Sequence, residues 1–224
     1  MQQQNPRAVT ITGGTGYVGR PLIEQLAGRG CAVTALARSG SGSRVPAGAT
    51  VVEGSALVAE DVARALTPGC TLVQLVGTPH PSPAKAKQFQ EVDLVSVRAA
   101  AEALARVPAA HVVYVSVAHP APMMQAYIDV RSEGERLLAA TGVPLTVLRP
   151  WYVLGPGHYW PFALAPLYGL LERLRPTRAM ALRLGLVTIG EMTAALVSSV
   201  ENPPAAERVL GVPEIALARI GAAA

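Results

Sequence analysis

The sequence has 224 residues, of which half are hydrophobic and 15% are charged, and its formal net charge is +4. This composition supplies ample apolar material for a core and is unlike that of disordered chains. The positive charge comes almost wholly from arginines scattered along the chain, whereas nucleic-acid-binding proteins gather theirs on one face. We therefore expect a single domain over residues 1–224 and no nucleic-acid partner.

The two cysteines, Cys31 and Cys70, have no metal-ligand spacing, and no pair of histidines has it. The N-terminus lacks the charged and apolar regions of a signal peptide. No apolar run reaches the ~18 residues that a membrane-spanning helix needs. The sequence thus predicts a cytoplasmic protein with no metal site and no transmembrane segment.

Strand and helix patterns alternate along the chain. Residues 8–11 form a β-branched strand that opens onto a glycine-rich turn at 12–19, and apolar residues at helical spacing follow as far as Gly28. Further strands are predicted at 32–37, 50–53, 71–76, 111–116, 145–148 and 208–212, and further helices at 61–66, 89–106, 124–140, 162–174 and 192–200. This alternation predicts right-handed crossovers and an α/β fold, a doubly wound Rossmann-type parallel sheet with helices on both faces and a small C-terminal region on the substrate side.

The turn after the first strand has the glycine spacing of a dinucleotide-binding loop. Gly14, Gly16 and Gly19 match GxGxxG, and Gly13, Gly16 and Gly19 match the GxxGxxG variant of shorter dehydrogenases. Glycine lets the backbone turn tightly and approach a pyrophosphate at the N-terminus of the next helix. The place between a strand and a helix is the context that this motif requires. The turn residues expected to bind the cofactor are Gly13, Thr15, Gly16, Tyr17, Val18 and Gly19.

The end of the second predicted strand bears on the choice between NAD and NADP. NAD-specific sites carry an acidic residue there, about 20 residues after the glycines, which binds the ribose 2′-hydroxyl. This chain has Arg38 and Ser39 instead, and a guanidinium attracts a 2′-phosphate that a carboxylate would repel. We therefore expect NADP(H) to be preferred over NAD(H), with Arg44 adding to the positive charge. The alternative is an ordinary surface arginine.

Two proline-stiffened loops, 77–81 and 119–122, follow strands at the edge where open α/β sheets bind ligands. We expect them to wall the nicotinamide side, with Gly77 in contact with the cofactor. His80 and His119 in these loops could serve as acid or base groups, or be bystanders.

Tyr127 and Arg131 stand four residues apart on a predicted helix and so share one face. A phenol can protonate a developing alkoxide, and a cation beside it lowers its pKa. The same face could instead contact the cofactor. A third interpretation is plain surface decoration, in which Glu135 neutralises Arg131.

Most of the aromatic residues gather between Trp151 and Tyr168, in a stretch rich in proline and glycine. Such a concentration beside an irregular loop predicts a substrate pocket or lid, which we place at residues 150–186. The alternatives are a satellite core or a contact surface, at 151–168, for a second copy of the chain or another protein.

Together these features resemble the short-chain dehydrogenase/reductase superfamily, in particular its atypical, NmrA-like and NAD(P)H-binding, epimerase-like branch. The resemblance covers nearly the whole chain. It rests on the 12–19 turn, the strand residues 113–116, the helix with Tyr127, and the stretch 148–157, which looks like the family's RPxxvxGPG signature bordering the nicotinamide.

The resemblance implies roles for several residues. Tyr127 would be the catalytic acid, Arg131 would stand where the family has its lysine, and Ser116 would stand where it has a serine after the fifth strand. Pro150 and Tyr152 in the signature loop would border the cofactor. Arginine does not readily lose a proton, so the family's proton relay is altered here.

Two further departures concern the ligands. Gly54 and Ser55 stand where relatives often have Gly-Asp, so an adenine contact is expected to change. The C-terminal part is short compared with that of sugar-nucleotide epimerases, which makes sugar epimerisation the less favoured chemistry.

The function expected from these patterns is reduction, by NADPH, of a small carbonyl compound, quinone or similar acceptor. One alternative is a non-catalytic NADP(H)-sensing regulator like NmrA, motivated by the altered Tyr127 and Arg131 pair. Another is an accessory or assembly subunit, motivated by the aromatic stretch.

Overall fold

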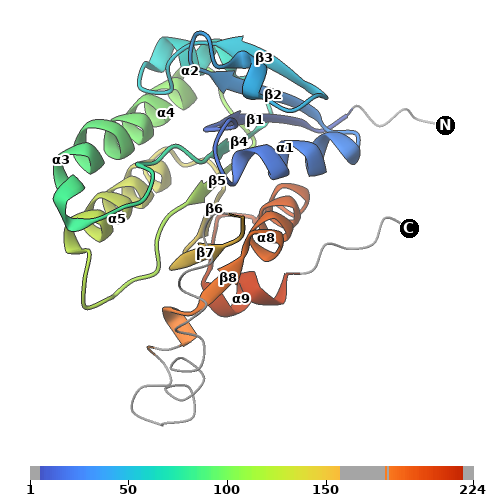
Figure 1. Cartoon of the computed structure of the whole chain (residues 1–224). Coiled ribbons are helices and arrows are strands. Elements are labelled where there is room, and N and C mark those ends of the chain that lie inside the picture. The colour runs from blue at the N-terminus through green and yellow to red at the C-terminus, as the bar shows by residue number, and fades with distance from the viewer. Residues whose placement is uncertain (1–5, 157–179, 181, 219–224) are drawn as a thin grey trace.

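A seven-stranded parallel sheet forms the centre of the computed structural model, which describes residues 6–156, 180 and 182–218 (Figure 1). Its strands are β1 (Ala8–Thr12), β2 (Ala32–Ala37), β3 (Ala49–Glu53), β4 (Thr71–Gln74), β5 (His111–Val115), β6 (Leu145–Leu148) and β9 (Glu207–Leu210). They lie in the order β3-β2-β1-β4-β5-β6-β9. The connections after β1 and β4 therefore leave in opposite directions, and such a switch point leaves a crevice at the carboxyl ends of the strands. The predicted doubly wound α/β fold is confirmed.

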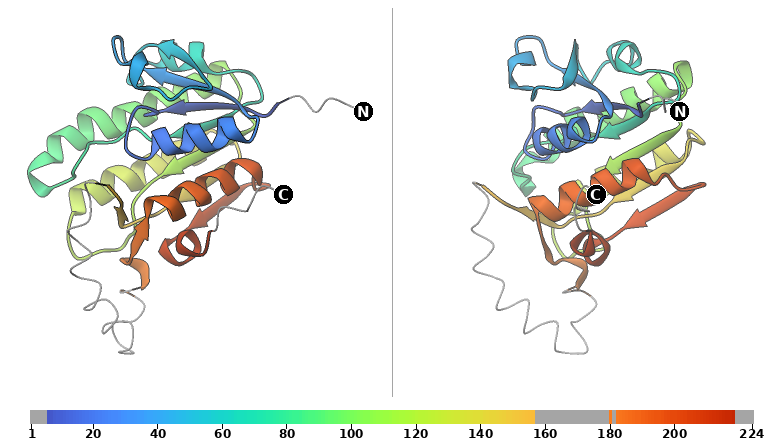
Figure 2. Two further views of the ribbon diagram at one scale, coloured as in Figure 1. Left: turned by 45° about the vertical axis from the view of Figure 1, so that its right-hand side comes forward. Right: turned by 90° about the vertical axis from the view of Figure 1, so that its right-hand side faces the viewer.

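Helices cover both faces of the sheet (Figure 2). On one face α1 (Gly19–Gly28) packs against α8 (Ile189–Glu201), and α8 also contacts the short α9 (Val212–Leu217). On the other face α4 (Val95–Arg106) lies between α2 (Ala59–Ala65) and α5 (Gln125–Ala139). The remaining short elements are η1 (Gly42–Arg44), η2 (Pro83–Lys85), α3 (Ala86–Gln88) and the π-helical η3 (Phe89–Leu94).

Alternate residues of each strand face the two helical layers. Val9 and Ile11 of β1 pack in one apolar cluster with Leu22 of α1, whereas Val112 and Tyr114 of β5 belong to the cluster on the opposite face. Both faces are buried, which explains why these strands read as nearly continuous apolar runs in the sequence.

Several predicted boundaries shift. β4 ends at Gln74, two residues before the predicted end, and Val212 begins α9 instead of closing the last strand. The helix expected from residue 89 starts with the π-helical turn η3 before α4. The helix predicted at 162–174 lies outside the described residues.

A second, two-stranded parallel sheet pairs β7 (Tyr152–Leu154) with β8 (Leu186–Thr188). It was not predicted from the sequence. Tyr152 is in register with Leu186, and Leu154 with Thr188. Thr188 then caps α8, because its hydroxyl accepts the Glu191 N–H while the Glu191 carboxylate accepts the Thr188 N–H.

No helix within the parts of the chain that the structure describes is both long and apolar enough to span a membrane.

Candidate functional site

The glycine turn lies against the end of β4 with no room for side chains at two positions. Gly13 has φ +75°, and a Cβ there would lie 3.0 Å from the carbonyl carbon of Leu75. A Cβ on Gly19 would lie 2.4 Å from the carbonyl oxygen of Gly13. The Gly16 N–H closes the turn by donating to that same oxygen at 3.0 Å. The close approach that a dinucleotide loop requires is therefore present.

The N-terminus of α1 is open to an anion. Val18 occupies the N-cap position and provides no side-chain cap, and the first turn contains no acidic residue. The first N–H groups of a helix lack intrahelical partners and carry the positive end of the helix dipole. Here the Arg20 N–H donates to the Gly16 carbonyl at 3.2 Å, and Pro21 has no N–H. A pyrophosphate would therefore meet the N–H groups of Val18 and Gly19, without repulsion from a carboxylate, which fits the diphosphate of a dinucleotide.

A cavity of about 400 Å³ adjoins this turn. Thr15, Gly16 and Tyr17 line it from the turn, while Pro156 closes it from the signature stretch. The two motifs are in contact, since a Cβ on Gly155 would lie 2.1 Å from the Tyr17 hydroxyl. The structure thus brings two separately predicted motifs to one place.

Arg38 and Ser39 lie exposed just after β2, where the ribose of a dinucleotide would be expected. The structure adds a residue that sequence reasoning missed. Glu53, the last residue of β3, accepts a hydrogen bond from the Ser39 hydroxyl at 3.3 Å. A carboxylate therefore lies next to Ser39, the residue that follows Arg38, and it is contributed by the neighbouring strand β3.

The adenine-side loop after β3 also has a carboxylate that was not expected. Asp61 of α2 accepts the Ser55 N–H at 2.7 Å. That N–H is the main cause that lowers the pKa of Asp61, burial opposes it, and Arg64 lowers the pKa further. A carboxylate at the start of α2 therefore binds this loop, although position 55 itself is a serine.

Arg131 is buried, with its side chain 5% exposed, and this corrects the surface-decoration interpretation. Its Nη2 donates to Asp93 at 2.7 Å, and its Nη1 donates to the carbonyl of Val115 at 3.1 Å. Glu135 does not neutralise it, because that carboxylate pairs with Arg149. Burial by itself lowers the pKa of Arg131, but two neighbouring phenols and the carboxylate outweigh that effect and raise it.

Asp93 links the loop after β4 to the end of β5, because it binds both Thr78 and Arg131. Its second oxygen accepts the N–H of Thr78 at 2.8 Å and the hydroxyl of Thr78 at 2.6 Å. Gly77 fits tightly beside the ion pair, since a Cβ there would lie 2.1 Å from Arg131 Nη2. The Asp93 and Arg131 pair therefore fixes the loop after β4 against the end of β5. No sequence signal marked Asp93.

Tyr127 is half-buried next to this pair. Its ring packs against Phe89, with centroids 4.9 Å apart, and the Arg131 guanidinium carbon lies 5.1 Å from its ring centre. The predicted proximity of Tyr127 and Arg131 is real, but the contact is with the face of the ring. The Arg131 N–H groups that form hydrogen bonds point to Asp93, backbone carbonyls and the hydroxyl of Tyr114.

Ser116 follows β5 and is 3% exposed. Its N–H donates to Leu148 at 2.7 Å, whereas its hydroxyl has no hydrogen-bond partner among the described residues. A buried hydroxyl without a partner is costly, so this group is suited to meet a bound ligand. Pro150 is also buried, and its carbonyl accepts the N–H of Ala118, two residues after Ser116, at 2.9 Å. Tyr152 begins β7.

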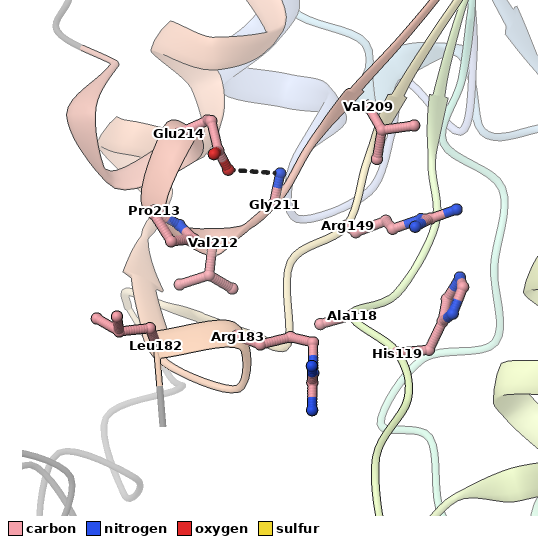
Figure 3. A pocket seen from close by; sticks show the side chains of 10 residues that line it. All are labelled: Ala118, His119, Arg149, Leu182, Arg183, Val209, Gly211, Val212, Pro213 and Glu214. Carbon is pink, nitrogen blue, oxygen red and sulfur yellow. Dashed lines mark hydrogen bonds between the residues drawn. The ribbon is translucent and has the colours of Figure 1, made fainter. Parts of the chain in front are cut away.

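A second cavity, of about 250 Å³, opens where β5, β6 and β9 end (Figure 3). His119 and Arg149 both line it. Arg149 Nε donates to Glu135 at 3.0 Å, and His119 Nε2 lies 3.6 Å from the same carboxylate. His80, by contrast, is exposed and lines neither cavity.

Within residues 6–156, 180 and 182–218, no group of three histidine, cysteine or acidic side chains is arranged to hold a metal ion. The aromatic residues between Tyr159 and Tyr168, central to the predicted lid, lie outside the described residues.

A family model described as NAD(P)H-binding matches residues 13–156. Similar solved structures include a short-chain dehydrogenase/reductase superfamily protein from Agrobacterium tumefaciens with bound NAD, at 16% identity and TM-score 0.66, covering 92% of this chain and 77% of that one. They also include the Bordetella bronchiseptica enzyme WbmH in complex with NAD+, at 19% identity and TM-score 0.68, covering 92% and 76%.

A third is UDP-glucuronic acid 4-epimerase from Bacillus cereus in complex with NAD, at 16% identity and TM-score 0.66, covering 91% of this chain and 77% of that one. No curated protein matches this sequence. At these identities the solved structures establish a shared fold, and the family model identifies residues 13–156 as NAD(P)H-binding.

Proposed function

This chain belongs to the NAD(P)H-binding family and has the fold of short-chain dehydrogenases/reductases, and we propose that it uses NADPH to reduce a small carbonyl compound or quinone. The observation that carries the proposal is the unpartnered hydroxyl of Ser116, buried at the carboxyl end of β5. This is the edge at which open α/β sheets bind their ligands.

The chain's own residues have distinct tasks in this reaction. The glycine turn and the open end of α1 hold the diphosphate. When bound, NADPH supplies a hydride to the carbonyl carbon of the acceptor. Tyr127 donates the proton that the carbonyl oxygen takes up, and Ser116 donates a hydrogen bond to that oxygen. Since Arg131 cannot release a proton, the Tyr127 phenol is reprotonated from solvent.

Replacing Tyr127 with phenylalanine tests this assignment. We expect kcat for NADPH oxidation to fall about a hundredfold, the usual contribution of a general acid, while the Kd for NADPH stays within about twofold. Both quantities are measured with a panel of aldehydes, ketones and quinones. Asp129→Asn, an exposed change on the same helix, is the control and should leave both unchanged. Full activity in Tyr127→Phe would remove Tyr127 from the mechanism.

A non-catalytic NADP(H) sensor is the second candidate. The observation that favours it is the commitment of Arg131 to Asp93, which leaves Tyr127 without the relay that the family's lysine provides. If the protein binds NADPH tightly but oxidises it with no member of the panel, the sensor hypothesis replaces the reductase hypothesis.

The preference for NADP(H) over NAD(H) is part of the proposal and rests on Arg38. Its guanidinium forms no ion pair with the described residues, so it can hold a 2′-phosphate through charge-assisted hydrogen bonds. Glu53 opposes this preference, because its carboxylate lies beside Ser39 and would repel the same phosphate.

Arg38→Ala should therefore raise the Kd for NADPH about tenfold and leave that for NADH within about twofold, since a hydrogen bond to a charged group contributes about 1.5–3 kcal/mol. Glu53→Gln should tighten NADPH by about two- to fivefold, because the two exposed charges interact through water. Both constants come from fluorescence titrations, with the exposed Arg98→Ala on α4 as the control. Equal losses for both cofactors in Arg38→Ala would contradict the 2′-phosphate assignment.

A further inference from the structure

The cavity at the ends of β5, β6 and β9 is separate from the cavity at the glycine turn, and its walls are partly apolar. Ala118, Val209 and Val212 contribute to its lining. Its volume of about 250 Å³ is just below the range for small-molecule sites, roughly 300–1,000 Å³. A ligand held there is small, well below the size of a sugar nucleotide.

Most of the charge around this cavity is already balanced. Glu135 binds the guanidinium of Arg149 through both of its oxygens. Glu214 turns toward the backbone, where its carboxylate accepts the Gly211 N–H at 2.9 Å, and Figure 3 shows it on the side of the cavity away from His119. Glu135 therefore balances the charge of Arg149, whereas Glu214 keeps its negative charge.

Arg183 is different. It lies just before β8 and lines the cavity, and its guanidinium makes no ion pair within the described residues. Its Nε is buried and has no hydrogen-bond partner in the same part of the chain. A buried N–H left without a partner costs about 1–3 kcal/mol, and this cost is removed when an acceptor enters the cavity.

We propose that this cavity binds the carboxylate of a small substrate, with Arg183 as its anchor. The proposal rests on the proposed reductase function and names its substrate class: a small carbonyl compound that also carries a carboxylate. The planar guanidinium matches a carboxylate with two parallel hydrogen bonds. A monoanion suits the site better than a phosphate dianion, because Arg183 is its one unbalanced arginine among the described lining residues and Glu214 is negative.

The binding test needs no turnover. Benzoate and its neutral analogue benzamide are titrated into the full-length protein, with and without NADPH, while arginine Nε–Hε signals are followed by NMR. The Arg183 signal is assigned from its loss in Arg183→Gln. We expect benzoate to shift this signal in a saturable manner and to bind at least about tenfold more tightly than benzamide, as one charge-assisted pair implies.

Variants separate the anchor from a general effect of charge. Arg183→Gln should weaken benzoate about tenfold or more, Arg183→Lys should keep part of the affinity, and the exposed Arg98→Gln should change nothing. Thermal unfolding and NADPH affinity show whether each variant is folded. Loss of benzoate binding in Arg98→Gln as well would mean that charge in general, and not Arg183, is responsible.

The remaining outcomes separate the two proposals. If benzoate leaves the Arg183 signal unmoved while neutral carbonyl compounds are reduced, the carboxylate site is wrong and the reductase stands. If benzoate binds through Arg183 but nothing is reduced, the site stands and the reductase is wrong. Tighter binding of inorganic phosphate than of benzoate would overturn the assignment to a carboxylate.

Discussion

Gly19→Ala is expected to weaken NADPH binding about a hundredfold. The added Cβ would lie 2.4 Å from the Gly13 carbonyl oxygen and 2.7 Å from the Gly14 Cα, and both neighbours are backbone atoms that cannot rotate away. The turn must open, and the N–H groups at the start of α1 no longer point at the diphosphate and cannot form hydrogen bonds to it. Losing two charge-assisted hydrogen bonds at about 1.5 kcal/mol each gives this factor.

The same substitution should also cost about 1–3 kcal/mol of unfolding free energy, as overpacking usually does. Gly28→Ala is a matched control at the other end of α1, because a Cβ there meets nothing within 4 Å. It should leave NADPH affinity unchanged and stabilise the helix by about 0.5–1 kcal/mol. Denaturant unfolding and NADPH fluorescence measure the two effects. Normal NADPH affinity in Gly19→Ala would contradict the placement of the diphosphate.

Asp93→Asn should destabilise the protein by about 3–5 kcal/mol, because it leaves the buried guanidinium of Arg131 without its counter-charge. The Asp93 side chain is 0% exposed, so water cannot compensate. The double variant Asp93→Asn, Arg131→Met removes both charges and should be less destabilised than Asp93→Asn alone. The unfolding free energies of the unmodified chain, Asp93→Asn and the double variant are measured in denaturant.

A surface pair provides the control for this experiment. Glu102 and Arg106 form an exposed ion pair on α4, and Glu102→Gln should change stability by less than about 1 kcal/mol. An Asp93→Asn protein as stable as the unmodified chain would show that Arg131 does not depend on this carboxylate. It would also reopen the possibility that Arg131 turns toward Tyr127.

The sheet could be predicted because its signals are local. β2 and β6 have the predicted bounds, since each is a short apolar run flanked by residues that break it. The glycine turn was recognisable for a similar reason: its spacing, the strand before it and the helix after it are adjacent in sequence. Both features follow from short-range rules.

The partners of the site residues could not be predicted in this way. Arg131 is 38 positions from Asp93 in the chain, and the residue pattern around each of them gives no sign of a partner so far away. Glu135 is four residues from Arg131 on the same helix, so the sequence favoured an ion pair between these two, but Glu135 pairs with Arg149. Glu53 was likewise hidden, because it reaches Ser39 only through the pairing of β2 with β3.

The missed sheet of β7 and β8 was undetectable for another reason. Each strand has only three residues, too few to show an alternating pattern. Their pairing depends on contacts between residues far apart in the chain.

The pairing of β7 with β8 has a consequence for how such proteins diversify. β7 and β8 pair in parallel, so the connection at 155–185 begins at the carboxyl end of β7 and ends at the amino end of β8, and one small sheet holds both of its attachment points. Closing a loop costs only about 0.6 kcal/mol more for each doubling of its length. The segment can therefore be lengthened, shortened or exchanged while the seven-stranded sheet and the glycine turn stay as they are. New ligand preferences can then arise by replacing one insertion, without redesigning the domain that carries it.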